Sequence, residues 1–196
     1  MWDERYAADE YIYGTEPNEL LLEHARELSG PVLCIAEGEG RNAVFLASLG
    51  LEVLGVDSST VGLGKARALA ESRGVSIATQ VADLADYLPQ PNTYGAVVSV
   101  FAHLPSQIRQ RLYPLLEQCL LPGGMLVLEA YSEAQISRDT GGPKDPDMLM
   151  SEAKIEAEFA NLDAQFLQET QRQVVEGSYH TGLADVVQFI GRKPTP

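Results

Sequence analysis

The sequence has few cysteines and no long apolar run. Its two cysteines, Cys34 and Cys119, both lie in short apolar segments of the 196-residue chain. A free thiol in such a segment packs as a small hydrophobic group, so we expect both to be buried and unbridged. No stretch approaches the roughly 18 to 20 apolar residues of a membrane-spanning helix, and the polar start is unlike a signal peptide. These absences predict a cytoplasmic protein without a membrane span.

Basic residues are also scarce. The chain has 14 Lys and Arg against 28 Asp and Glu, a formal net charge of −14, with no basic cluster. Such a surface repels a phosphate backbone, so nucleic acid is not an expected partner. The three histidines are far apart in sequence and the two cysteines stand singly, so no metal site is expected.

From residue 32 onward, short apolar segments alternate with amphipathic helical patterns. The segments with β-strand character are Val32–Ala36, Glu52–Val56, Val75–Val81, Ala96–Phe101 and Met125–Tyr131. Helical spacing follows the fourth of them, with apolar residues at Ile108, Leu112 and Leu115. This alternation predicts an α/β fold with a doubly wound, mostly parallel sheet and helices on both faces.

The end of the chain has a different pattern. Two long runs, Ala164–Glu176 and Gly182–Gly191, are separated by only five residues, too few for a crossover helix. We therefore expect a C-terminal antiparallel hairpin that completes seven strands in a single domain, residues 1–196. Residues 1–29 and 132–150 lie outside the alternation, and such segments are commonly lids or binding loops.

A glycine turn, Glu37-Gly38-Glu39-Gly40-Arg41-Asn42, follows the first predicted strand. Glycine permits close approach of a ligand to the backbone, and the free N–H groups of the helix that begins there favour an anionic group. Taken alone, Gly38-x-Gly40-x-x-Ala43 fits a nicotinamide fingerprint as well as an S-adenosylmethionine loop. The motifs further along the chain are needed to distinguish these two cofactors.

Acidic residues follow the second and third predicted strands. Asp57 is placed to accept hydrogen bonds from the hydroxyls of an adenosine ribose, or instead to cap the next helix beside Ser58. Asp83 can accept from the exocyclic amine of an adenine, with the backbone N–H of Leu84 near a ring nitrogen. Aspartate is also common at strand ends for purely local reasons.

Together with Tyr94-Gly95-Ala96-Val97-Val98 and Leu120-Leu121-Pro122-Gly123-Gly124, these motifs resemble class I methyltransferases over nearly the whole chain. Within that class, Glu39 to Ala47 and Tyr11 to Asn18 are similar to the tellurite-resistance and thiopurine methyltransferase group. The resemblance implies S-adenosylmethionine as cofactor and a small-molecule acceptor such as a thiol or chalcogen oxyanion. The residues it implies for the cofactor are Glu37, Gly38, Gly40, Arg41, Asn42, Asp57, Ser58, Asp83, Leu84 and Phe101.

The first strand departs from the family pattern. Cys34 stands where the family usually has an acid, and Ala36 and Glu37 stand where glycine or alanine is common. Glu37 can supply a nearby replacement carboxylate, cap the following helix, or point to solvent.

Candidate acceptor-site residues are expected beyond the carboxyl ends of the strands. They are Tyr6, Tyr13, His103, Tyr131 and His180. Methyl transfer mainly requires alignment and exclusion of water, so few catalytic groups are obligatory. If a base is needed, His103 is the best candidate, although it can instead cap the helix that begins near Ser106. Tyr6 and Tyr13 are expected to belong to an N-terminal lid.

Two other functions are considered. A nicotinamide oxidoreductase would share the glycine turn and Asp57, but no tyrosine is followed four residues later by lysine, and no second domain is available for a substrate. A catalytically silent S-adenosylmethionine-binding protein is left open by Cys34 and Glu37.

Overall fold

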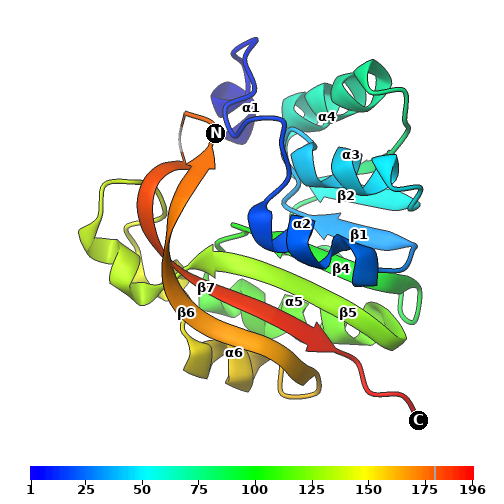
Figure 1. Ribbon diagram of the computed structural model, residues 1–196, viewed down its shortest axis with the longest axis vertical. Coiled ribbons are helices and arrows are strands. Elements are labelled where there is room, and N and C mark those ends of the chain that lie inside the picture. The colour runs from blue at the N-terminus through cyan, green and yellow to red at the C-terminus, as the bar shows by residue number, and fades with distance from the viewer. Residues whose placement is uncertain (179) are drawn as a thin grey trace.

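The computed structural model describes residues 1–178 and 180–196; Tyr179, in the predicted hairpin connection, lies outside them. Seven strands form one sheet in the order β3-β2-β1-β4-β5-β7-β6 (Figure 1). Their bounds are β1 Val32–Ile35, β2 Val53–Asp57, β3 Ala78–Val81, β4 Tyr94–Val100, β5 Leu120–Tyr131, β6 Asp163–Glu176 and β7 His180–Arg192. Strands β1 to β5 pair in parallel, whereas β7 is antiparallel to both β5 and β6. The predicted doubly wound, mostly parallel sheet with a C-terminal hairpin is confirmed.

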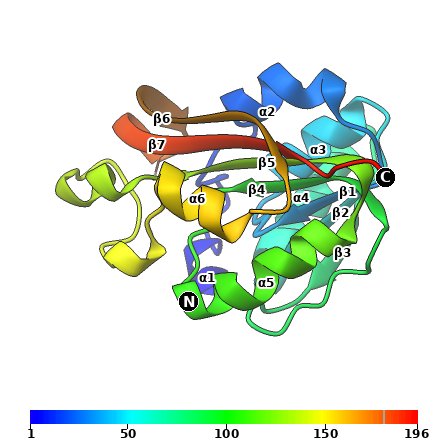
Figure 2. The same ribbon diagram turned by 90° about the horizontal axis from the view of Figure 1, so that it is seen from below.

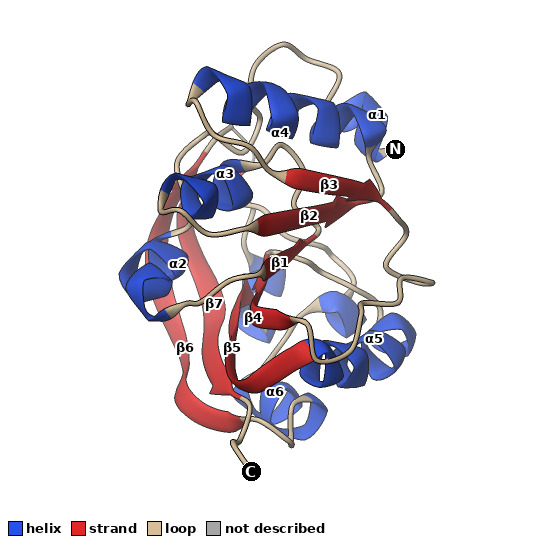
Figure 3. Cartoon of the chain, turned by 90° about the vertical axis from the view of Figure 1, so that its right-hand side faces the viewer, coloured by secondary structure: helices blue, strands red, loops and turns tan. Residues whose placement is uncertain are grey.

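Helices cover both faces of this sheet. The α-helices are α1 Trp2–Arg5, α2 Glu19–His24, α3 Arg41–Ser48, α4 Thr60–Ser72, α5 Ser106–Cys119 and α6 Glu152–Glu158, and the short 3-10 helices are η1 Ala25–Glu27, η2 Glu133–Ser137 and η3 Pro146–Met148. Figures 2 and 3 show α2 and α3 on one face and α5 and α6 on the other. In the described part of the chain, no helix is both long and apolar enough to span a membrane.

The alternation of side chains along β1 accounts for the two layers. Val32 and Cys34 pack with α2 and α3, whereas Leu33 and Ile35 pack on the opposite face with α5. Successive residues of a strand point to opposite faces, so a strand buried on both sides is apolar throughout. All four residues of β1 are buried.

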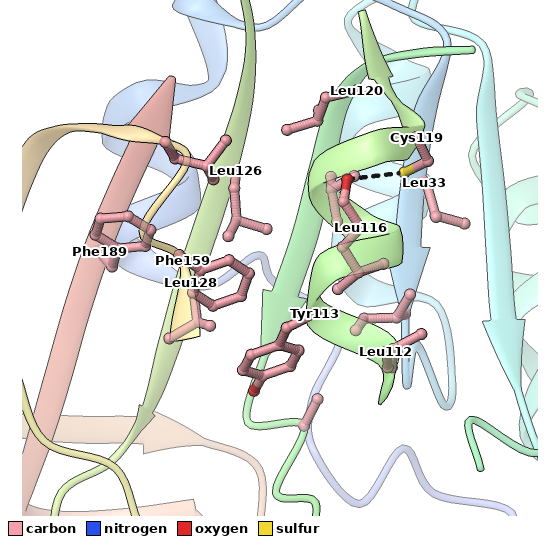
Figure 4. Close-up of a cluster of buried hydrophobic side chains, with 14 of the residues drawn as sticks. Leu33, Leu112, Tyr113, Leu116, Cys119, Leu120, Leu126, Leu128, Phe159 and Phe189 are labelled. Carbon is pink, nitrogen blue, oxygen red and sulfur yellow. Dashed lines mark hydrogen bonds between the residues drawn. The ribbon is translucent and has the colours of Figure 1, made fainter. Parts of the chain in front are cut away.

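The core between the sheet and α5 holds one of the two cysteines (Figure 4). Tyr113 of α5 stacks on Phe159 with ring centroids 4.4 Å apart, and Phe159 stacks on Phe189 of β7. The thiol of Cys119 donates to the carbonyl oxygen of Leu116 at 3.1 Å. Both cysteines are buried and free, as predicted from their apolar surroundings.

Several predicted strand boundaries were wrong. Strand β5 begins at Leu120, five residues before the predicted Met125. Strand β3 begins at Ala78 instead of Val75, because β3 is an edge strand that pairs only with β2 and Val75 closes the C-terminal turn of α4. Strand β7 begins at His180, two residues earlier than predicted, because Glu176 and His180 pair across the tip. His180 is therefore a strand residue.

The two segments outside the alternation both reach the carboxyl end of the sheet. The N-terminal segment, residues 1–18, contacts the hairpin tip, where the N–H of Ser178 donates to the carbonyl oxygen of Ile12 at 2.9 Å (Figure 1). The insertion, residues 132–150, lies beside β7, and the hydroxyl of Thr140 donates to the carbonyl oxygen of Leu183 at 2.9 Å. Chain segments distant in sequence thus meet at one edge.

Candidate functional site

A cavity of about 640 Å³ opens at the carboxyl ends of β1, β2 and β4. Its volume is within the range of roughly 300 to 1,000 Å³ of small-molecule sites, and open α/β sheets bind ligands at this edge. The structure brings together there these residues predicted from sequence: Glu37, Arg41, Asn42, Asp57, Ser58, Asp83, Leu84, Phe101, Tyr6, Tyr13, His103 and His180. Among the described residues, the predicted Gly38, Gly40 and Tyr131 do not line this cavity.

Both glycines of the turn have left-handed backbone, with φ of 59° at Gly38 and 91° at Gly40. A Cβ at Gly38 would lie 2.5 Å from the hydroxyl oxygen of Tyr6, and one at Gly40 would lie 2.5 Å from the Cβ of Ala66 in α4. The sequence suggested that a ligand makes the close approach. In the structure the protein's own Tyr6 ring and helix α4 already require glycine at these positions.

Asp57 joins the glycine turn to the end of β2. One carboxylate oxygen accepts from the N–H of Gly38 at 2.9 Å, and the other accepts from the N–H of Ser59 at 2.8 Å. Burial raises the pKa of Asp57, and these N–H donors act in the opposite direction. The N-cap of α4 is Ser59, whose hydroxyl accepts from the N–H of Gly62. Asp57 therefore supports the turn while it faces the cavity.

Asp83 is exposed at the mouth of the cavity. Its side chain accepts from the N–H of Ala85 at 2.8 Å, which is the local turn geometry expected of an aspartate after a strand. The structure thus shows the local role and the cavity position together.

Glu37 does not point to solvent. Its side chain is buried, and one oxygen accepts from the N–H of Ala43 in the first turn of α3 at 2.8 Å. It therefore caps the following helix, one of the alternatives raised by the sequence. Burial raises the pKa of Glu37 to about 7, against the effect of the Ala43 donor and Arg41.

Two non-glycine residues with left-handed backbone line the cavity. Ala36 follows β1 with φ of 49°, and Phe101 follows the adjacent strand β4 with φ of 51°. This conformation is uncommon outside glycine and, for a bulky residue, is found mainly at functional sites. The N–H of Phe101 donates to the carbonyl oxygen of Glu129 at 2.7 Å, which holds the backbone in place.

An aromatic cluster, defined as Tyr6, Tyr13, Phe101, His103, Tyr131 and His180, connects the N-terminal segment to the sheet. Ring centroids lie 4.5 Å apart for Tyr13 and His180, 4.7 Å for Phe101 and His180, and 6.3 Å for Tyr6 and Tyr13. Tyr131 is fully buried behind these rings, 4.7 Å from Phe101. The insertion covers it, since a Cβ at Gly142 would lie 2.7 Å from the Tyr131 ring.

The two histidines of this cluster are neutral. The Nε2 of His103 accepts from the backbone N–H of Tyr131 at 2.9 Å, and burial lowers the pKa of His103 to about 3. Burial lowers the pKa of His180 to about 4, and its Nδ1 has no partner in the part of the chain that the structure describes. His103 does not cap α5, because Asp147 accepts from the N–H of Ser106 at 2.7 Å. That alternative was wrong.

A buried ionic network beneath the cavity was not predicted. The amide of Asn18 donates to Glu129 at 2.9 Å and to Glu176 at 3.0 Å, and Arg172 pairs with both carboxylates. Arg41 pairs with Glu176 at 2.6 Å. In the sequence, the only indication of this network was the charged residue Glu129 within the apolar run of β5. Its partners lie too far away in sequence for pattern reasoning to connect them.

Comparisons with known proteins agree with this geometry. Residues 32–124 match the family model described as a methyltransferase domain. Among curated proteins, the chain is similar to 2-heptyl-1-hydroxyquinolin-4(1H)-one methyltransferase from Mycobacteroides abscessus. The identity is 24% over 131 residues, covering 65% of this chain and 58% of the relative. The chain therefore spans less than two thirds of that relative's length.

Solved structures show the same architecture. A protein studied for the conversion of a disulfide bond into a thioacetal group during echinomycin biosynthesis superposes with a TM-score of 0.76 and 21% identity, covering 98% of this chain and 91% of that one. TehB from Haemophilus influenzae superposes with a TM-score of 0.73 and 17% identity, covering 98% and 65%. The chain has the class I methyltransferase fold. The narrower tellurite-resistance grouping stays a prediction, since such identities show the fold alone.

The match of residues 32–124 to a methyltransferase domain implies S-adenosylmethionine as the methyl donor. S-adenosylmethionine is strictly a co-substrate, because its methyl group is consumed. The lining of the cavity fits this molecule, since it includes the carboxylates of Glu37, Asp57 and Asp83, and S-adenosylmethionine carries a sulfonium and an ammonium group.

Proposed function

We propose that this chain transfers the methyl group of S-adenosylmethionine to a small-molecule acceptor held in the same cavity. The observation that carries this proposal is the composition of the cavity's two ends. Acidic residues from the ends of β1, β2 and β3 lie toward one end, beside Tyr6, and the rings of Tyr13, Phe101 and His180 form the other. A cationic methyl donor and a less polar acceptor would then meet between β1 and β4.

The roles proposed for the co-substrate residues follow the strand order. Asp83 and Leu84 after β3 would hold the adenine, and Asp57 with Ser58 after β2 would hold the ribose. The remaining residues proposed for the co-substrate are Glu37, Gly38, Gly40, Arg41, Asn42 and Phe101. Gly38 and Gly40 would act indirectly, through the turn that Asp57 holds.

The contribution of the chain to the reaction would be alignment and exclusion of water. In-line displacement needs the nucleophile roughly 3 to 3.5 Å from the methyl carbon, on the side opposite the sulfur. Tyr13, Phe101 and His180 form one packed wall of the cavity, and the contact of Ile12 with Ser178 closes the lid over it. His103 would support Tyr131 instead of acting as a base, because its Nε2 is already engaged.

For the acceptor, the packed rings of Tyr13, Phe101 and His180 favour an aromatic molecule over a chalcogen oxyanion. The histidines at this end are uncharged, and Arg41 is paired with Glu176. Of the predicted acceptor classes, a thiol fits this end better than an oxyanion, and an aromatic hydroxyl fits equally well. The acceptor named for the Mycobacteroides abscessus relative, a hydroxyquinolone, is of the aromatic kind.

The test is transfer of a labelled methyl group. The full chain is incubated with methyl-labelled S-adenosylmethionine and a panel of thiols, thiopurines, phenols, hydroxyquinolones and chalcogen oxyanions, and labelled products are separated by mass. Transfer to an aromatic hydroxyl or thiol is expected. Binding of adenosylhomocysteine without transfer to any acceptor would instead favour a silent binding protein. Thermal stabilisation by NAD alone would reject the proposal.

A further inference from the structure

The side chain of Glu37 occupies a space that the two neighbouring strands leave for it. Cys34 of β1 and Gly55 of β2 are paired in register. A Cβ at Gly55 would lie 3.3 Å from the Cγ of Glu37, closer than most side-chain contacts, so a larger residue at 55 would crowd this carboxylate. The small residues at positions 34 and 55 therefore make room for one buried carboxyl group.

The charged and titratable groups around the Glu37 carboxyl group belong to α3, β1, β2 and the segment after α1, which all pack against it. Arg41 of α3 lowers its pKa, and Asp57 of β2 raises it. Burial raises the pKa of the Cys34 thiol on β1 and of the Tyr6 hydroxyl after α1, and Glu37 acts in the same direction on both. In the part of the chain that the structure describes, no salt bridge includes Glu37, since Arg41 pairs with Glu176. A buried carboxylate without a paired cation favours binding of one.

The strand order places the positive part of the co-substrate beside Glu37. With adenine at β3 and ribose at β2, the sulfonium and ammonium groups fall at the end of β1, about 4.8 Å further along the sheet. Glu37 lies at this end of β1, and Phe101 of the aromatic end follows at β4. This placement rests on the proposed function.

We propose that Glu37 is a charge-sensing positioning residue, partly protonated at neutral pH when the cavity holds no cation and ionised when S-adenosylmethionine binds. Methyl transfer removes the sulfonium charge, so the ionised carboxylate loses part of its attraction to the product. Glu37 therefore makes the site bind S-adenosylmethionine more tightly than adenosylhomocysteine and promotes product release. Burial raises the pKa of Glu37 to about 7, which makes both protonation states accessible near neutral pH.

The experiment is calorimetric titration of the full chain with each ligand at pH 7, in phosphate and in Tris, whose ionisation enthalpies differ. For the wild type we expect release of close to half a proton with S-adenosylmethionine. In Glu37→Gln the proton release disappears and affinity for S-adenosylmethionine falls about tenfold, whereas affinity for adenosylhomocysteine, which keeps the ammonium group but has no sulfonium charge, falls by a smaller factor. The amide oxygen of glutamine can still accept from Ala43, and thermal unfolding checks the fold. The exposed Glu52→Gln is the matched control and should behave as wild type.

Two further measurements keep the proposal falsifiable. Cys34→Asp combined with Glu37→Gln returns a carboxyl group to the same space and is expected to restore the preference for S-adenosylmethionine. In the wild type, that preference should decline as the pH falls from 8 to 5.5, because the carboxyl group is then protonated. If wild type and Glu37→Gln preferred S-adenosylmethionine over adenosylhomocysteine equally, or if the preference did not depend on pH, the inference about Glu37 would be overturned. The proposed function would not be affected. Failure of the wild type to bind either ligand would overturn the proposed function and the inference with it.

Discussion

The backbone N–H of Tyr131 donates to Nε2 of His103 at 2.9 Å, and the two rings stack with centroids 5.2 Å apart. This bond makes Nε2 the acceptor nitrogen, so the proton of the neutral imidazole is on Nδ1. It also joins the end of β5 to the segment that follows β4. A histidine that looked like a base in the sequence thus holds the backbone of the adjacent strand.

The pH dependence of stability follows from the burial of this histidine, which lowers its pKa. The pKa of His103 is about 3 in the folded chain and near 6.5 unfolded, so the unfolded chain binds the proton first. Stability from His103 is therefore complete above pH 6.5 and is lost as the pH falls from 6.5 toward 3. Between pH 6 and 4.5, the unfolding free energy of His103→Gln should depend on pH less steeply than that of the wild type, by about 1.4 kcal/mol per pH unit.

Urea unfolding at several pH values measures this difference. Glutamine can still accept from Tyr131, so the variant is expected to fold. Glu37 contributes in the opposite sense, because its raised pKa gives stability that is lost as the pH rises through 7, and it does so equally in both proteins. Identical slopes in the two proteins would contradict a neutral His103.

Asp57→Ala should weaken binding of adenosylhomocysteine by about 1.5 to 3 kcal/mol, the range for a lost hydrogen bond to a charged group. It should also lower stability, because Gly38 and Ser59 each lose their acceptor. Calorimetric titration and thermal unfolding measure the two effects. The control is Asp86→Ala, an exposed position in the turn after β3, for which neither effect is expected. Unchanged affinity in Asp57→Ala would remove Asp57 from the site.

Arg172→Met should destabilise the chain by about 3 to 5 kcal/mol, because it leaves the buried carboxylates of Glu129 and Glu176 without this partner. Burial alone would raise the pKa of Glu176, and Arg41 and Arg172 hold it below its ordinary value. The matched control is Arg73→Met. Arg73 pairs at 3.0 Å with Glu16, whose side chain is 83% exposed, so a loss below about 1 kcal/mol is expected. Equal losses in urea unfolding would show that the network contributes no more than a surface pair.

Gly177→Ala should displace the N-terminal segment, which tests whether that segment acts as a lid. A Cβ at this position would lie 2.1 Å from the carbonyl oxygen of Ile12, so the N-terminal segment must move off the hairpin tip. The control is Gly74→Ala, which has nearly the same φ (69° against 70°) and nothing within 4 Å of the added Cβ. Both should lose about 1 to 2 kcal/mol from the strained backbone, but Gly177→Ala alone should lower turnover. Equal turnover in the two variants would reject the lid.

Much of the fold was predictable, because it depends on local patterns. Apolar segments separated by amphipathic helices indicate parallel strands, and a five-residue connection between the last two runs permits only a hairpin. Residues directly after strands, such as Asp57 and Asp83, were placed at the correct edge for the same reason. The start of β3 was wrong because an edge strand has one partner and weaker patterning.

The orientation of side chains was not predictable. The sequence allowed three directions for Glu37, and the space beside Gly55 selects the inward one. Tyr131 was expected to line the site but lies behind it, because the insertion covers its ring. These outcomes depend on contacts between segments far apart in the chain, and no local pattern encodes them.

The sequence by itself determined the order of the motifs along the chain, the glycine turn, and the acidic residues at the ends of β2 and β3. Each of these depends on neighbours within one βα unit. The tertiary structure alone decided which of these groups are buried, neutral or paired. Burial sets the pKa of Glu37 and His103, and the fold brings Asn18 to Glu129 and Glu176 across 111 and 158 residues. The physical reason is that desolvation and charge pairing depend on distances in space, which separation along the chain does not fix.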